Sequence, residues 1–177
     1  MNDVSAREVS IRSSSVRDIK KADTVTVTQG GVNAIDAKTV TVNQGGVVQV
    51  NAETLNLKQG GIVRAEAEQV QVTQGGIGLV QADNVELNAG GTVAILGTNI
   101  GVQAGGSQYM LARESIRVEQ GGAALMAAPR IEVENGFAAF LIAREVHGNV
   151  RTLLDRRGAL LFGLAAGIVM GVIARAK

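Results

Sequence analysis

The sequence predicts an all-β fold: a single-stranded β-solenoid (β-helix) of about eight to nine coils with a fifteen-residue repeat, followed by a C-terminal transmembrane α-helix. Three observations predict it. A glycine pair recurs every fifteen residues, apolar and polar residues alternate beside that pair, and one long uncharged run lies near the C-terminus. A coil this short cannot bury its own apolar face, so it is stable only when stacked on its neighbours.

The repeating unit is clearest in residues 39–53, TVTVNQGGVVQVNAE. Glycine pairs follow one another at a spacing of fifteen residues, at Gly30-Gly31, Gly45-Gly46, Gly60-Gly61, Gly75-Gly76, Gly90-Gly91 and Gly105-Gly106. The next pair, Gly121-Gly122, comes one residue late, and Asn135-Gly136 holds the following place. Glycine suits a corner because it reaches backbone angles that residues with a Cβ avoid.

Apolar residues mark the side of each coil that is expected to face the core. Before the glycines, Val40 and Val42 alternate with polar residues, which is the period of a half-buried strand. After the glycines, apolar residues take the first, fourth and sixth places, as in Val47, Val50 and Ala52. The step of three between the first two places breaks the alternation, so we expect a second, softer corner there.

A glutamine precedes the glycine pair in four consecutive units. These residues are Gln29, Gln44, Gln59 and Gln74, and Gln120 follows after two alanines. If the coils stack, the amides can pair along the axis as an amide ladder. Alternatively, glutamine is simply tolerated at a corner, and the sequence leaves both interpretations open.

Residues 1–23 are predicted to form an N-terminal arm and a capping coil. In the stretch 8–23, Val9 and Ile11 stand where Val25 and Val27 stand one unit later, and Ser14-Ser15 takes the place of the glycines. Its charged residues suit a terminal coil, which must block an open strand edge. A disordered arm is the alternative, and we expect no signal peptide in residues 1–6.

Residues 24–143 are predicted to form the solenoid, and some of them are apolar beyond what a core requires. Six such residues lie in the second and third places after the glycines: Val48, Val63, Leu79, Val93, Tyr109 and Leu125. Either they turn inward at the softer corner, or they form an apolar stripe along one edge of the rod. A stripe of this kind marks a surface for a protein partner or for self-association.

Polarity also falls along the axis of the predicted rod. The final unit reads GFAAFLIA over residues 136–143 and has almost no polar residue. Such a coil cannot have an ordinary solvated exterior. We expect it to be capped by the following segment, packed against another subunit, or seated against lipid.

The segment after the solenoid predicts a membrane anchor. Residues 144–157 form a basic juxtamembrane segment, in which residues 145–157 can be a short helix or a final coil. Residues 158–174 carry no charge and, at 1.5 Å per residue, would reach about 25 Å as a helix, the short limit for a membrane span. A buried core helix is the alternative, but a slender solenoid has nowhere to bury one.

The predicted tail anchor carries two further features. Gly163, Gly167 and Gly171 share one helical face, which permits close packing between spans. The basic residues before it, which are expected to contact lipid headgroups, are Arg144, Arg151, Arg156 and Arg157. The positive-inside rule then places the solenoid in the cytoplasm, most simply at a bacterial inner membrane.

The sequence predicts no enzyme and no cofactor or metal site. There is no cysteine, the single histidine is His147, and the carboxylates have no converging His, Cys or Arg. The sequence contains neither a phosphate-binding loop nor a basic patch with aromatic residues. We therefore expect no nucleic-acid partner. Outward rows such as Thr24, Thr26 and Thr28 resemble the flat face of insect antifreeze proteins, but the row decays within two units.

The repeat region, roughly residues 8–143, resembles the bactofilins in architecture, as a β-helix of coils rich in Val, Ile and Gly. The resemblance implies a cytoplasmic scaffolding element that assembles end to end and recruits other proteins. The Gln-Gly-Gly unit and the C-terminal span depart from that family. We therefore expect a membrane-anchored structural or scaffolding protein that contacts membrane lipid and a protein partner or further copies of itself. The alternative is a surface protein that binds ice or polysaccharide through its outer Thr, Asn and Gln rows.

Overall fold

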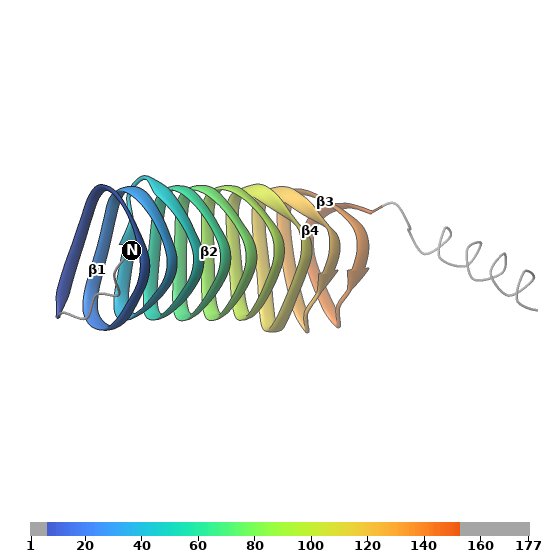
Figure 1. The fold of residues 1–177 in the computed structure, drawn as a ribbon. Helices are drawn as coiled ribbons and strands as arrows, with labels where there is room; N and C mark the ends of the chain where they lie inside the picture. The colour runs from blue at the N-terminus through green and yellow to red at the C-terminus, as the bar shows by residue number, and fades with distance from the viewer. Residues whose placement is uncertain (1–6, 153–177) are drawn as a thin grey trace, which may run out of the picture.

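The computed structural model describes residues 7–152 as a parallel β-solenoid of about eight turns. Its strands are β1 (Glu8–Val42), β2 (Gly45–Ala127), β3 (Arg130–Ile142) and β4 (Glu145–Thr152), in the order β1-β2-β3-β4. Figure 1 shows the coils stacked along one axis, with β1 at one end and β3 and β4 at the other. The all-β solenoid predicted from the repeat is thus confirmed.

Each coil pairs with the coil one repeat further along the chain. Val32 pairs with Val47 and Val40 with Leu55, an offset of fifteen residues, and all the ladders are parallel. The predicted C-terminal span, residues 158–174, lies outside the described residues. Within residues 7–152, no helix is long and apolar enough to cross a membrane.

The core is a column of aliphatic side chains that runs the length of the rod. The expected inward places before the glycines are filled by fully buried residues such as Leu55 and Leu57. Val47 and Val50 are buried in the first and fourth places after the glycines, and Ala52 in the sixth is half-buried. The inward pattern predicted from the repeat is confirmed, including the step of three.

The first glycine of each pair is required by the backbone and by the coil below it. At Gly60, φ is 135°, and a Cβ would lie 2.1 Å from the carbonyl oxygen of Gly45. Six other first glycines also have positive φ: Gly30, Gly45, Gly75, Gly90, Gly105 and Gly121. No side chain fits such a position, because backbone atoms of the neighbouring coil fill the space.

The placement of Asn135-Gly136 as the last corner pair is wrong by one residue. Gly121 pairs with Gly136 and Gly122 with Phe137, so Asn135 takes the place of the repeated glutamine. Positive φ recurs at the first glycine of the pairs and not at the second. The second place thus does not need positive φ, and in the coil of β3 it holds the side chain of Phe137.

Both ends of the described chain are coils of the stack. A Cβ on Gly30 or Gly31 would meet Ser14 or Ser15, which places the two serines beneath the first glycine pair as expected. Residues 8–23 belong to β1, so they form a coil and not a disordered arm. At the other end β4 pairs with β3, so the strands continue past residue 143, and residues 145–152 form a coil and not a helix.

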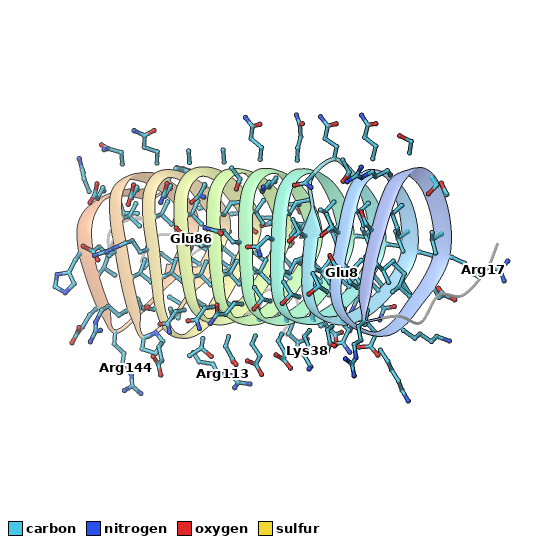
Figure 2. All side chains as sticks on the ribbon, turned by 90° about the vertical axis from the view of Figure 1, so that its left-hand side faces the viewer. Glu8, Arg17, Lys38, Glu86, Arg113 and Arg144 are labelled. Atoms are coloured by element: carbon cyan, nitrogen blue, oxygen red, sulfur yellow. The ribbon has the colours of Figure 1, made fainter. Side chains whose placement is uncertain are left out.

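The predicted amide ladder is present in the N-terminal coils. Gln29 Nε2 donates to Gln44 Oε1 at 3.3 Å, and Gln44 Nε2 donates to Gln59 Oε1 at 2.9 Å. Ser13 extends it by donating from its hydroxyl to Gln29 Oε1 at 3.2 Å. Figure 2 shows the side chains that fill the rod and those that project from it, with Lys38, Arg113 and Arg144 along one edge.

Candidate functional site

The six apolar residues singled out by the repeat lie on the outside of the rod. We call them the apolar edge: Val48, Val63, Leu79, Val93, Tyr109 and Leu125. Val48, Val63, Val93 and Tyr109 have exposed fractions between 46% and 61%, and Leu79 and Leu125 are half-buried. At about 4.8 Å per coil, the edge extends about 24 Å along the axis.

The apolar edge exists because two consecutive residues face outward at the softer corner. In the unit of Val48, Val47 is buried before the corner and Val50 after it, so the two residues between them point away from the core. Successive units use one or the other of these two places for an apolar side chain. Burying them inward would overfill a core that is already continuous.

A groove accompanies the N-terminal half of the apolar edge. Its volume is about 850 Å³, and its lining includes Gly46, Gly61, Val48 and Val63. The second glycines leave this strip without side chains, so the two valines stand beside a backbone floor. The groove is a shallow apolar channel along the rod.

The exposed apolar surface broadens in the last coils. Phe137, Phe140 and Ile142 of β3 have exposed fractions of 45%, 52% and 65%. The residues chosen from the repeat omitted these three, although Phe140 takes the place of Leu125 one coil later. The near absence of polar residues in 136–143 had already indicated an apolar exterior in this coil.

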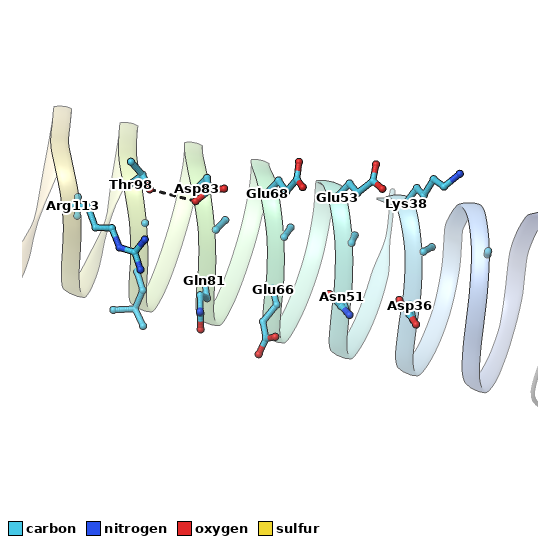
Figure 3. Close-up of a pocket in the computed structure, with 18 of the residues that line it drawn as sticks. Asp36, Lys38, Asn51, Glu53, Glu66, Glu68, Gln81, Asp83, Thr98 and Arg113 are labelled. Carbon is cyan, nitrogen blue, oxygen red and sulfur yellow. Dashed lines mark hydrogen bonds between the residues drawn. The ribbon is translucent and has the colours of Figure 1, made fainter.

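A second surface is polar and runs parallel to the edge. We call it the acidic groove: two outward rows of side chains run along it, with Asn51 and Glu66 in one row and Glu53 and Glu68 in the other (Figure 3). Alanines such as Ala52 and Ala67 also line it. The groove has a volume of about 990 Å³, and six acidic and three basic residues line it. Three carboxylates follow one another on consecutive coils, at Glu53, Glu68 and Asp83.

Ion pairs neutralise part of this charge. Lys38 Nζ lies 2.8 Å from Asp23 Oδ1, and this hydrogen bond with its charge attraction raises the pKa of the lysine ammonium. Arg64 pairs with Glu66. In the part of the chain that the structure describes, no group of three or more His, Cys, Asp or Glu side chains is arranged to hold a metal ion. The groove is therefore a solvated charged surface.

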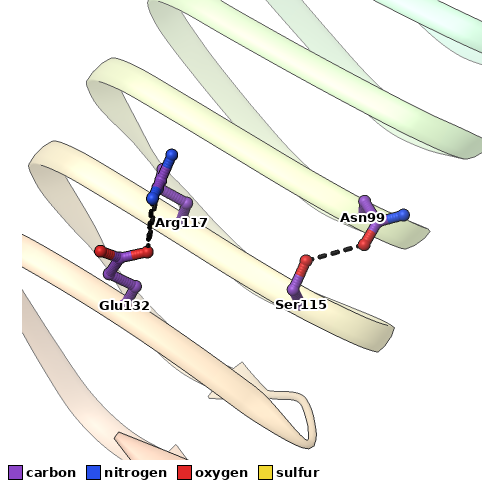
Figure 4. Close-up of polar contacts among 4 residues, drawn as sticks. All are labelled: Asn99, Ser115, Arg117 and Glu132. Atoms are coloured by element: carbon purple, nitrogen blue, oxygen red, sulfur yellow. Dashed lines mark hydrogen bonds and ion pairs between the residues drawn. The ribbon is translucent and has the colours of Figure 1, made fainter. Parts of the chain in front are cut away.

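A third surface, the polar wall, is formed by outward residues before the glycines. Polar side chains bond to those one coil away: Ser115 Oγ donates to Asn99 Oδ1 at 2.7 Å, and Arg117 Nη2 to Glu132 Oε2 at 2.7 Å (Figure 4). The bond to Glu132 raises the pKa of Arg117. Most of these groups thus serve as partners for one another along the axis.

The predicted membrane and lipid residues fall at or beyond the described end. Arg144 is exposed, and Arg151 lies in β4. Arg156, Arg157, Gly163, Gly167 and Gly171 lie outside the described residues. Their roles remain predictions from the sequence.

Comparisons with known proteins add no further assignment, because no protein-family model, no characterised protein and no solved structure matches this chain. The resemblance to the bactofilins therefore stands on the solenoid architecture alone.

Proposed function

We propose that the chain is a membrane-tethered scaffold, a rod that holds protein contacts along its apolar edge. The observation that carries this proposal is the apolar edge: six successive coils each place an apolar side chain outside at the softer corner, and it is exposed in coils such as those of Val48, Val63 and Val93. Rows of this kind on soluble surfaces mark sites of association. The partner is a second protein or further copies of the chain, as in a self-assembling element or an accessory subunit of a membrane complex.

The tether in this proposal is the uncharged run of residues 158–174, with Arg144, Arg151, Arg156 and Arg157 at the headgroups. Close packing of Gly163, Gly167 and Gly171 between spans would add a second contact between copies. The arginines favour a cytoplasmic rod at a bacterial inner membrane. No catalysis is part of the proposal, because the carboxylates of the acidic groove are solvated and His147 lies apart on the last coil.

The test is the mass of the native complex extracted in detergent, measured for the full chain by crosslinking and mass spectrometry. A double variant, Val63→Asp with Leu79→Asp, places two charges on the apolar edge. We expect it to reduce the complex to the mass of a single chain. The matched control, Thr41→Asp with Asn56→Asp, places the same charges on the polar wall and should leave the mass unchanged. A wild-type chain that extracts as a lone monomer contradicts the proposal.

The polar wall supports a second candidate, a surface that binds ice or polysaccharide. A shallow cavity of about 670 Å³ on this wall is lined by residues such as Asn56, Gln71 and Asn84, whose side chains suit sugar hydroxyls. Under this proposal, a variant with bulky residues at Thr26 and Thr41 on the wall and at Asn56 and Gln71 in the cavity loses binding to immobilised polysaccharide or to ice. Unchanged binding by that variant removes the candidate.

A further inference from the structure

One side of the last coils differs from the other in a way that bears on how the rod meets a membrane. Phe137, Phe140 and Ile142 lie around the softer corner of β3: Phe137 stands in the second glycine place before it, Phe140 at it and Ile142 after it, and all three are exposed. On the opposite side the same coil presents Glu132 and Glu134, of which Glu134 is exposed and Glu132 is held by Arg117. The coil of β3 is therefore apolar around its softer corner, which we call its apolar side, and acidic on the strand before its glycine.

The described chain ends on the apolar side of this coil. In the pairing of β4 with β3, Arg151 lies opposite Phe137, and Thr152 lies opposite Ala138. The described chain thus ends beside the exposed phenylalanines and away from Glu132, which pairs with His147. The segment that follows starts from the side that exposes the apolar residues.

Chain length limits how far this side can stand from the uncharged run. Five residues lie between Thr152 and Gly158, so six residue steps join the two. Even fully extended, they span about 20 Å, at 3.3–3.6 Å per residue. The headgroup region accounts for about 5–8 Å of that distance. If residues 158–174 enter a bilayer, the apolar side of β3 lies close to its surface.

From these three observations we infer that Phe137, Phe140 and Ile142 form a lipid-contacting foot. The foot inserts into the bilayer interface and makes the rod lean toward its apolar side. This inference rests on the proposed membrane tether. Apolar side chains such as phenylalanine suit the boundary between headgroups and acyl chains, into which an apolar face is buried about 5–10 Å. The carboxylates of Glu132 and Glu134, on the opposite side, stay in water and away from anionic headgroups.

Size favours lipid over a second copy as the occupant of this patch. A large aromatic side chain buries 150–250 Å², so three half-exposed side chains offer about 300 Å². A stable protein interface buries about 800 Å² on each partner. The foot alone is therefore too small for a dimer, whereas contact with a bilayer has no such threshold because the tether holds it there.

The test places a fluorescent label on each side of the same coil. The chain has no cysteine, so a single substitution gives one labelled site. Ala139→Cys labels the apolar side and keeps all three foot residues; Glu134→Cys, on the opposite side, is the matched control. The full chain is reconstituted into vesicles of phosphatidylcholine and phosphatidylglycerol, with and without brominated acyl chains, and flotation measures vesicle binding.

We expect the label at residue 139 to be quenched by brominated lipid several-fold more strongly than the label at residue 134. Adding Phe140→Ser and Ile142→Ser should reduce quenching at residue 139 while flotation persists. Equal quenching at both sites in floated vesicles overturns the foot and leaves the tether standing. A label at residue 139 that is shielded from water, unquenched by brominated lipid and crosslinked to another chain also overturns it. Failure to float overturns the tether and the foot together.

Discussion

The early and late coils of this rod share one core and differ in their exterior. Val40 and Val42 are fully buried in an early coil, and Ile131 and Val133 are equally buried in the corresponding places of a late one. Outside, the fifth place after the glycines holds Asp36, Asn51, Glu66 and Gln81 in successive early coils, and Leu96, Leu111, Ala127 and Ile142 in the late ones. The inward pattern specifies the solenoid, so the outer places are free to differ from one end to the other.

Breaking the shared part of the coils should have the largest effect. Gly60→Ala places a Cβ against the carbonyl oxygen of Gly45 at a φ of 135°. We expect the free energy of unfolding to fall by roughly 2–4 kcal/mol, from backbone strain and overpacking. Urea titration of the full chain in detergent, followed by circular dichroism, measures it. Gly61→Ala is the control, because its Cβ would meet no atom closer than 3.9 Å, and an equal loss in both variants would contradict the account.

A fully buried and a half-buried leucine sharpen the contrast between core and exterior. Leu57→Ala removes a fully buried side chain and should cost about 3 kcal/mol, because the removed atoms leave a cavity. Leu79→Ala, on the apolar edge, should cost about 1 kcal/mol or less. The same urea titration compares the two. If Leu79→Ala proved as costly, Leu79 would belong to the core.

The amide ladder distinguishes early coils from late ones by a smaller margin. Gln44→Leu removes the bonds to Gln29 and Gln59 at an exposed corner, and should cost about 0.5–1 kcal/mol. Gln74→Leu should be neutral, because Gln74 makes no side-chain bond to another described residue and its place is taken by Ala89 one coil later. Thermal unfolding of the two variants measures the difference. Equal shifts would mean that the ladder adds no stability.

The smallest effect concerns the ion pair between Lys38 and Asp23. The folded-state pKa of Lys38 is raised above 10.5, so its stabilising contribution is complete below pH 10.5 and is lost as the pH rises through the raised value. Wild type should therefore melt slightly above Asp23→Asn at pH 8, and the gap should close as the pH rises through the raised pKa of Lys38. If the difference in melting temperature persisted in strong alkali, Asp23 would stabilise the fold by something other than its attraction to the charged lysine.

Much of this fold follows from the sequence because the repeat constrains the structure many times over. The burial of Val47 and Val50, and the stacking of Ser14 beneath Gly30, both follow from aligning one unit with the next. The position of Phe137 in the second glycine place could not be predicted, because the sequence alone does not show which glycine of a pair needs positive φ. The sequence also left undecided whether Val63 is exposed, because either of two adjacent residues at a corner can point toward the core.

The central claim is that the apolar edge is covered in the native membrane. Single cysteines at Val48, Val63 and Val93 on the edge, and at Thr41 and Asn56 on the polar wall, can be treated there with a water-soluble maleimide. Labelling of the full chain is then compared before and after denaturation. The account predicts that the three edge cysteines are labelled only after denaturation, whereas the two wall cysteines are labelled in both states. Equal labelling of all five in the native membrane would contradict it.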